Sequence, residues 1–146
     1  MVFRFLLLAV SMLACAGPAL ADPCKAIPDR GPPPAWARPG YSVTGPARYV
    51  ADGDSLCVGP SKDPATWVEI RLVDFFAPEL AEPGGPSAKG ALERLTRGRT
   101  VTCTAVRGRS GRAVSYDRLI AVCRLGGASL GELMRRSGVS EGGKGR

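Results

Sequence analysis

The sequence predicts a mainly β domain with two helices, folded as a small five-stranded barrel of the OB type. Three observations support this fold class. Short apolar runs recur five times after residue 40, two stretches have helical spacing, and the order is three strands, a helix, two strands and a helix. With 146 residues and 45% hydrophobic content, the chain can build one hydrophobic core but not two.

The five predicted strands are short runs of alternating or clustered apolar residues. They are Tyr41–Val50, Ser55–Val58, Thr66–Val73, Thr100–Val106 and Arg118–Leu125. The fourth run is the clearest, because Val101, Cys103 and Ala105 share one face and threonines occupy the other. In the third run, Arg71 lies on the face opposite the apolar row. These patterns are typical of half-buried strands.

The two predicted helices are marked by spacing and by capping residues. The first, Ser87–Arg97, has apolar residues at helical spacing and stops at Gly98. The second begins with a capping box, in which Ser129 and Glu132 satisfy unpaired backbone amides, and it ends before Gly138. We expect the barrel domain to span residues 41–139.

Residues 1–21 have the pattern of a secretory signal peptide. A short segment with Arg4 precedes an apolar run, and Ala19-Leu20-Ala21 favours cleavage before Asp22. A membrane anchor is the alternative, but about 20 apolar residues are needed to span a bilayer. A second alternative is lipoprotein processing at Cys15. We expect an exported protein, periplasmic or extracellular, without a membrane span in the mature form.

Two further segments lack a predicted fold of their own. Residues 22–40 are rich in proline, which favours an extended N-terminal arm. Residues 140–146 include three glycines and two basic side chains, and we expect a disordered tail. The formal net charge of +7 makes a polyanionic partner electrostatically natural, but it also serves solubility.

Four cysteines follow the expected signal peptide, and export would place them in an oxidising compartment. Their even number favours two disulfides, although three pairings are possible and buried free thiols are the alternative. If the strand assignment is right, Cys103 and Cys123 lie on successive antiparallel strands, which leaves Cys24 to pair with Cys57. The chain has no histidine, which excludes a Ser-His-Asp triad and imidazole-ligated zinc.

Acids and arginines occur in four separate segments that suit phosphodiester chemistry. The segments are Asp52–Ser55, Glu69–Leu72, Ala77–Glu79 and Ser115–Arg118. A phosphodiester under attack gathers negative charge, so it needs fixed cations, a carboxylate to activate water and often a metal ion. Taken alone, Asp-Gly-Asp is usually a hairpin turn.

Several motifs keep the order and spacing of one known family. Asp-Gly-Asp-Ser, Ile-Arg-Leu with Ala-Pro-Glu soon after it, Gly-Arg-x-Val-x-Cys, Tyr-Asp-Arg, Ala-Val-Cys and the last helix resemble the staphylococcal nuclease (thermonuclease-like) family. The resemblance covers residues 46–139. It implies an OB-fold barrel and a calcium-dependent nuclease that hydrolyses DNA and RNA and leaves 3′-phosphate ends.

The resemblance also implies roles for single residues. Arg71 resembles the arginine that grips the phosphate, and Arg118 the second arginine that faces the developing charge. Glu79 resembles the carboxylate proposed to activate water. Tyr116 is expected to stack on the nucleotide or to hydrogen-bond it, with simple packing as the alternative.

The implied calcium site departs from the family pattern at one position. Asp54 resembles the metal-ligand aspartate, Asp52 its supporting neighbour, and Ala77 would offer its backbone carbonyl. Phe76 stands where a second aspartate ligand is expected, so we expect weak Ca²⁺ binding or a different metal. Asp74 is a further candidate ligand, although strand parity places it on the face of Leu72.

Three function classes follow from these observations. The first is a monomeric exported nuclease acting on DNA or RNA. The second is a nucleic-acid-binding OB module with weakened or lost catalysis, for which Phe76 is the main evidence. The third is an exported interaction domain that binds protein or a cell-wall polyanion, supported by charge alone. The basic loop 107–112 either follows phosphates or is a solvated hairpin end.

Overall fold

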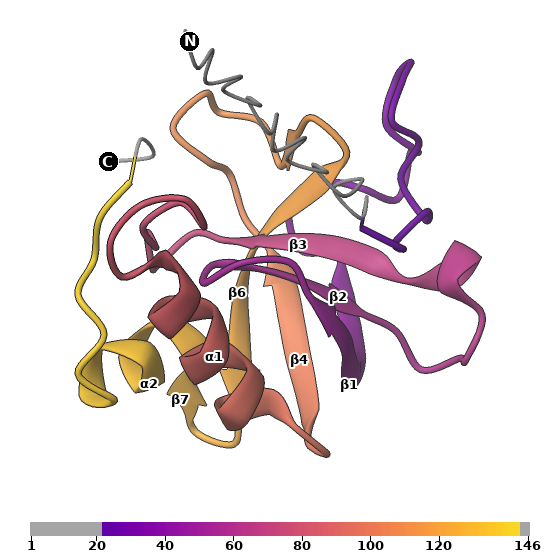
Figure 1. The fold of residues 1–146 in the computed structure, drawn as a ribbon. Coiled ribbons are helices and arrows are strands. Elements are labelled where there is room, and N and C mark those ends of the chain that lie inside the picture. Colours follow the sequence, from indigo (N-terminus) through magenta and orange to yellow (C-terminus); the bar gives the residue numbers. More distant parts are fainter. Residues whose placement is uncertain (1–21, 144–146) are drawn as a thin grey trace, which may run out of the picture.

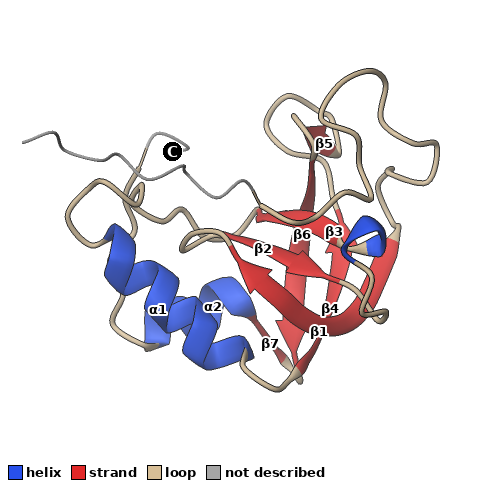
Figure 2. Cartoon of the chain, turned by 45° about the vertical axis from the view of Figure 1, so that its right-hand side comes forward, coloured by secondary structure: helices blue, strands red, loops and turns tan. Residues whose placement is uncertain are grey.

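The computed structural model describes residues 22–143. The expected signal peptide, residues 1–21, and residues 144–146 lie outside this range. Five long strands wrap into a closed barrel, and two helices pack side by side at one end of it (Figures 1 and 2). The predicted fold class, a mainly β barrel of OB type with two helices, is confirmed.

The barrel is closed by one parallel pairing in an otherwise antiparallel sheet. Its strands are β1 (Ser42–Val50), β2 (Ser55–Val58), β3 (Val68–Leu72), β4 (Thr100–Ala105) and β6 (Arg118–Leu125). Neighbours follow the order β3-β2-β1-β4-β6. The ends join because β3 runs parallel to β6, with Ile70 opposite Leu119 and Leu72 opposite Ala121.

Three short elements were not predicted. They are β5 (Val114–Ser115), β7 (Ala128–Ser129) and the 3₁₀ helix η1 (Pro64–Thr66). Elements of two or three residues are too short to show a hydrophobic period, so the pattern gave no sign of them. Strand β3 begins at Val68 and not at Thr66, because Thr66 belongs to the 3₁₀ helix. The Asp63 side chain caps this helix by accepting a hydrogen bond from the Ala65 N–H.

The helices begin and end close to the predicted positions. Helix α1 spans Gly85–Thr96, two residues ahead of the predicted start. Helix α2 spans Leu130–Arg136, and its predicted cap is formed, since the Ser129 hydroxyl accepts a hydrogen bond from the Glu132 N–H at 3.1 Å. Both helices cover the barrel end with apolar side chains.

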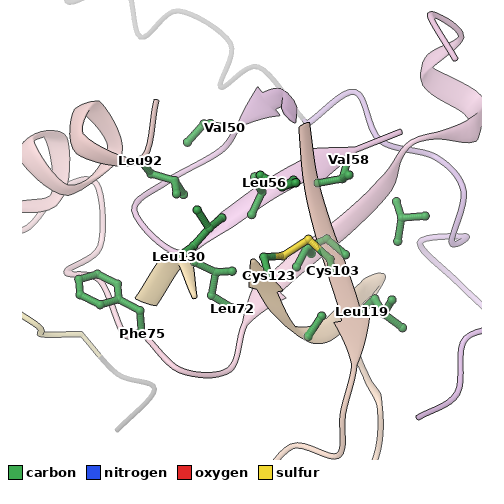
Figure 3. Packing of buried hydrophobic residues seen from close by; sticks show 14 of the residues in the cluster. Val50, Leu56, Val58, Leu72, Phe75, Leu92, Cys103, Leu119, Cys123 and Leu130 are labelled. Atoms are coloured by element: carbon green, nitrogen blue, oxygen red, sulfur yellow. A yellow bond between two sulfur atoms is a disulfide. The ribbon is translucent and has the colours of Figure 1, made fainter. Parts of the chain in front are cut away.

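The core fills the barrel and continues under the helices (Figure 3). Leu56, Leu72 and Leu119 point inward from three strands, and Leu92 and Leu130 reach them from the helices. All five are at most 1% exposed. Full burial of such a side chain stabilises the fold by about 1.5–3 kcal/mol. The barrel therefore forms a rigid base for the loops that leave its rim.

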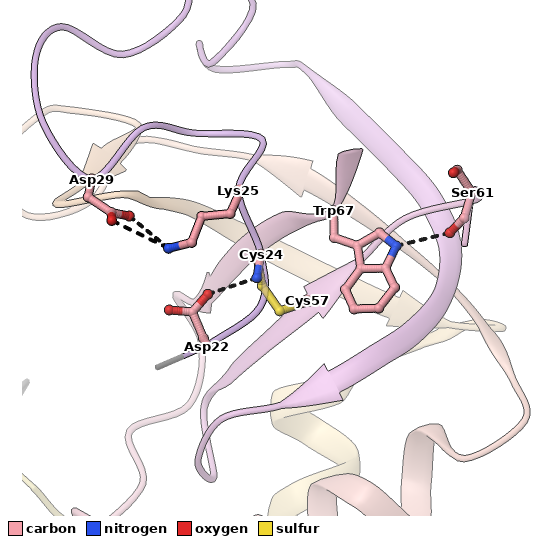
Figure 4. Close-up of a disulfide and its surroundings, with 7 residues drawn as sticks. All are labelled: Asp22, Cys24, Lys25, Asp29, Cys57, Ser61 and Trp67. Carbon is pink, nitrogen blue, oxygen red and sulfur yellow. Dashed lines mark hydrogen bonds and ion pairs between the residues drawn. A yellow bond between two sulfur atoms is a disulfide. The ribbon is translucent and has the colours of Figure 1, made fainter. Parts of the chain in front are cut away.

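Two disulfides join the cysteines in the pairing that the strand order favours. Cys103 and Cys123 are direct cross-strand partners on β4 and β6. Cys24 binds Cys57 and fixes the N-terminal arm to β2 (Figure 4). Two disulfides indicate folding in an oxidising, exported environment. No helix in residues 22–143 is long and apolar enough to cross a bilayer.

Both the N-terminal arm (residues 22–40) and the start of the C-terminal tail (residues 140–143) are held against the barrel domain. In the arm, the Ala26 N–H donates to the Trp67 carbonyl at 3.1 Å, and Ile27 is buried in the core. In the tail, the Gly142 N–H donates to the Phe76 carbonyl at 2.9 Å. Residues 140–143 thus lie against the loop after β3, which differs from the disorder we expected there.

Candidate functional site

One cavity of about 510 Å³ gathers residues from all four segments that suit phosphodiester chemistry. It is lined by Asp52, Asp54, Arg71, Ala77, Pro78, Glu79, Ser115, Tyr116 and Arg118. Every predicted catalytic, metal-binding and substrate-binding residue lies here except Asp74. The barrel brings them together because β3 pairs with β2 on one side and with β6 on the other.

The loop between β1 and β2 packs too closely for any residue but glycine at its centre. A Cβ atom on Gly53 would lie 2.5 Å from the Cβ atoms of both Ala77 and Ala88. Beside it, Asp52 acts as a turn residue, since its carboxylate accepts a hydrogen bond from the Asp54 N–H at 2.9 Å. The turn aims the Asp54 side chain into the cavity wall.

Asp54 is buried and fully engaged by its neighbours. Its Oδ2 atom lies 2.5 Å from Nη1 of Arg71 and accepts the Ala77 N–H at 2.7 Å. Burial, opposed by the Arg71 guanidinium and reinforced by the charge of Asp52, raises the pKa of Asp54 to about 6. In this structure the charge on Asp54 is met by Arg71.

Phe76 packs against two arginines at the edge of the cavity. The guanidinium carbon of Arg71 lies 5.3 Å from the ring centroid, and that of Arg109 lies 5.5 Å from it. Such contacts contribute about 0.5–1 kcal/mol each at exposed sites. The ring of Phe76 stands where the resemblance implies an aspartate, and it attracts cations through its face but offers no oxygen ligand.

Arg118 and Tyr116 form the opposite wall. Arg118 begins β6, and its Nη1 atom donates to the Ser55 hydroxyl at 3.3 Å. Its guanidinium carbon lies 6.0 Å from the ring centroid of Tyr116. Tyr116 is 86% exposed and has a φ of 59°, a left-handed conformation that is rare for bulky residues. This turn presents the aromatic ring to solvent beside the arginine.

Glu79 is the free carboxylate of the cavity. Its side chain is exposed, and no hydrogen bond or ion pair holds it among residues 22–143, although its N–H donates to Glu82 at 3.0 Å. The oxygen atoms of Glu79 are thus available to a proton or a water molecule. No ion pair joins Glu79 to either arginine of the cavity.

Asp74 lies elsewhere, so its expected role as a metal ligand is not supported. Its carboxylate faces helix α2, where a Cβ on Gly131 would approach Asp74 Oδ2 to 2.6 Å. The Oδ1 atom is buried without a hydrogen-bond partner. Alternation along the chain turns Asp74 to the side of Leu72, where α2 covers it, and not to the cavity.

The oxygen atoms around Asp54 make a poor calcium site. Calcium takes six to eight oxygen ligands. Here the Asp54 carboxylate is paired with Arg71, and the Asp52 carboxylate accepts a hydrogen bond from the backbone of its own turn. The Ala77 carbonyl is approached by the tail, because a Cβ on Gly143 would lie 2.4 Å from it. Among the described residues, no group of three close metal-ligating side chains includes Asp54. The residues present therefore do not fit a tightly bound calcium ion in this cavity.

A second group of acids near the cavity was missed by the sequence analysis. Asp22, Glu69 and Asp117 each place a carboxylate oxygen within 4.8 Å of the others. Burial, together with the charges of Asp22 and Asp117 and against the attraction of Arg118, raises the pKa of Glu69 to about 7. The expected Cys24–Cys57 disulfide could have indicated this group. Cys57 is the cross-strand partner of Glu69, so the disulfide brings the N-terminal arm, with Asp22, close to Glu69.

Comparisons with known proteins add no identification. No family model matches the chain, and a search of curated proteins found no match. The function is therefore inferred from the geometry of the site.

Proposed function

We propose that this protein is an exported nuclease that hydrolyses phosphodiester bonds of DNA or RNA in the 510 Å³ cavity. One observation carries the proposal: Arg71, Glu79 and Arg118, which come from three separate segments, line the same cavity. Two guanidinium groups and an unpaired carboxylate are the protein groups that such a reaction requires.

The arginines bind and stabilise the phosphate. A guanidinium group presents its N–H donors in a planar fork that matches phosphate oxygens. As water adds, negative charge grows on the non-bridging oxygens, and fixed donors of this kind typically contribute about 10²–10³-fold in rate each. Among residues 22–143, the Arg118 side chain donates one hydrogen bond, to the Ser55 hydroxyl, and it has no ion pair, so it is the freer of the two. Arg71 shares its charge with Asp54 until a phosphate competes for it.

Glu79 is the proposed general base. Its carboxylate takes a proton from the attacking water, the water oxygen bonds to phosphorus, and the bond from phosphorus to the 5′ oxygen breaks. The leaving 5′ oxygen takes a proton from solvent, Glu79 later returns its proton to solvent, and the phosphate stays on the 3′ end. The exposed and unpaired state of Glu79 supports this role, because a carboxylate held by an arginine would be a weaker base.

Features around the cavity suit a nucleic acid better than a small phosphate ester. The Tyr116 ring stands exposed at the cavity wall, where a base can stack on it. Arg109 lies beside Phe76 next to the cavity, and the formal net charge of +7 favours a polyanion. We expect the protein to act as a monomer.

Calcium is the cofactor that the family resemblance implies. The ligand set around Asp54 is incomplete because Phe76 replaces an oxygen donor, so we expect only loose Ca²⁺ binding in this cavity. Any cation there must first compete with Arg71 for Asp54.

A second candidate function is nucleic-acid binding without cleavage. The observation that favours it is the same pairing of Asp54 with Arg71, together with the ring of Phe76. In that case the cavity holds phosphate through its arginines, but no metal-bound or carboxylate-activated water attacks.

Cleavage of labelled single-stranded DNA and RNA separates the two functions. The purified protein is assayed with Ca²⁺ and with chelator, beside Glu79→Gln, Arg118→Ala and the control Glu93→Gln on helix α1. The nuclease proposal expects cleavage by the wild type and the control, and a loss of about 100-fold or more in the other two variants. Binding without cleavage in every sample would support the binding module.

A further inference from the structure

A group of three carboxylates lies outside the proposed phosphate cavity, in a place where three parts of the chain meet. Asp22 comes from the N-terminal arm, Glu69 from strand β3, and Asp117 from the turn between β5 and β6. One oxygen of each lies within 4.8 Å of the others. We call this group the acid cluster. Like charges at such distances repel each other unless a cation compensates them.

Glu69 gives the second and independent observation. It is only 7% exposed, and no hydrogen bond or ion pair reaches its carboxylate among residues 22–143. Buried ionised carboxylates in proteins are normally paired or bind a metal ion. The nearest cation on β6 is Arg118, which donates its hydrogen bond to Ser55 instead. Glu69 is thus a buried, unpartnered acid that points at two other acids.

The covalent structure holds the acid cluster in place. Cys57 and Glu69 are direct cross-strand partners, so the Cys24–Cys57 disulfide brings the arm to the same face of the sheet (Figure 4). The Cys24 N–H then donates to Asp22 Oδ1 at 3.0 Å, which fixes the orientation of the first carboxylate. A preorganised site loses little freedom when it binds an ion.

Other charges around the acid cluster do not neutralise it. Lys25 on the arm lies near Asp22 and Asp117, but its Nζ atom pairs with Asp29 at 3.0 Å on the exposed side. Arg118 attracts the Glu69 carboxylate, but Asp22 and Asp117 each act on it more strongly, and Asp52 adds a further negative charge. The balance of charge at Glu69 is therefore negative.

We propose that the acid cluster of Asp22, Glu69 and Asp117 is a binding site for a calcium-type divalent cation, which clamps the N-terminal arm to the barrel. Carboxylate oxygens are the donors that hard divalent cations prefer. Calcium binds oxygen at about 2.3–2.6 Å in flexible geometry, whereas magnesium demands near-ideal octahedral geometry, so an irregular set of carboxylates from three segments suits calcium better. Three side chains leave room for water ligands, so we expect a Kd of about 10⁻⁴ M.

The proposal is independent of catalysis, because no member of the acid cluster is assigned to the reaction. Titration calorimetry measures Ca²⁺ binding to the purified protein and to four variants: Glu69→Gln, Asp117→Asn, Asp54→Asn and Glu93→Gln. Besides any looser binding in the phosphate cavity, we expect one site with a Kd of about 10⁻⁴ M, and its affinity should be unchanged in Asp54→Asn and in the control Glu93→Gln. We expect affinity at least 10-fold weaker in Glu69→Gln and in Asp117→Asn.

Two results would overturn the proposal. One is binding that is lost in Asp54→Asn but kept in Glu69→Gln, which would place the ion in the phosphate cavity. The other is the absence of binding at millimolar Ca²⁺ in a folded wild type. If terminal sequencing then finds Asp22 as the first residue, its own α-ammonium group would be the cation that meets the acid cluster. Circular dichroism of each variant verifies that it is folded.

Discussion

Replacing Glu69 by glutamine is expected to stabilise the protein at pH 8 in the presence of chelator. In the folded state, burial and the neighbouring acids raise the pKa of Glu69 from 4.5 to about 7. A pKa difference of this size corresponds to about 3 kcal/mol, which is an upper limit because solvent and structural relaxation reduce it. Glutamine keeps the shape of the side chain and removes the charge.

The sign of the effect depends on pH. Since the folded pKa is the higher one, the folded state binds the proton more tightly, and the stability that Glu69 contributes is fully present below pH 4.5. It is lost as the pH rises through about 7. The wild type should therefore lose stability over this interval relative to Glu69→Gln. At pH 8 the variant should melt up to about 10 °C higher.

Thermal unfolding of both proteins between pH 4 and 8, with chelator throughout, measures this difference. Glu93→Gln removes the same charge from helix α1 and should change the profile little. Parallel pH profiles for wild type and Glu69→Gln would refute the reasoning, because they would mean that Glu69 ionises in the folded protein at no free-energy cost.

Three other changes test separate parts of the structure. In a Glu69→Gln background, Phe76→Asp introduces a carboxylate where the resemblance implies a metal ligand, and calorimetry should then detect Ca²⁺ binding at least 10-fold tighter than in the background; equal affinity would contradict the role given to Phe76. Replacing Cys24 and Cys57 together by serine opens a loop of 33 residues, which should lower the free energy of unfolding by about 3–4 kcal/mol in denaturant titrations. Gly53→Ala places a methyl group 2.5 Å from two alanine side chains, so it should cost about 1–3 kcal/mol and reduce cleavage; an unchanged melting temperature would argue against this packing.

The sequence predicts those strands and helices well whose apolar spacing or capping residues reflect contacts with the core or with nearby backbone. The alternation in β4 and the capping box of α2 both led to elements that the structure contains, because their side chains meet the core or the backbone amides next to them. The parallel pairing of β3 with β6 joins residues far apart in the chain, and no local period reports it. The order of strands and helices and the resemblance to a family implied a barrel, but not which strands close it.

In the cavity, too, contacts between residues far apart in the chain could not be predicted from local patterns. Motif spacing predicted which residues would gather, but it did not predict that Asp54 would pair with Arg71, since that contact depends on the depth of the β1–β2 loop. The alternation that puts Arg71 opposite the apolar row of β3 also puts Glu69 on that outer face, yet the arm packs there and Glu69 is buried. A residue on an outer strand face is exposed only if no other segment packs over it.

The central claim is that the cavity hydrolyses phosphodiester bonds with Glu79 as the base. The most direct test is the single-turnover rate of single-stranded DNA cleavage at saturating protein, for wild type and Glu79→Gln, with DNA affinity measured separately. The account expects an affinity unchanged within about 2-fold and a rate at least about 100-fold lower in the variant. Equal cleavage rates, or a wild type that binds DNA and leaves it intact, would contradict it.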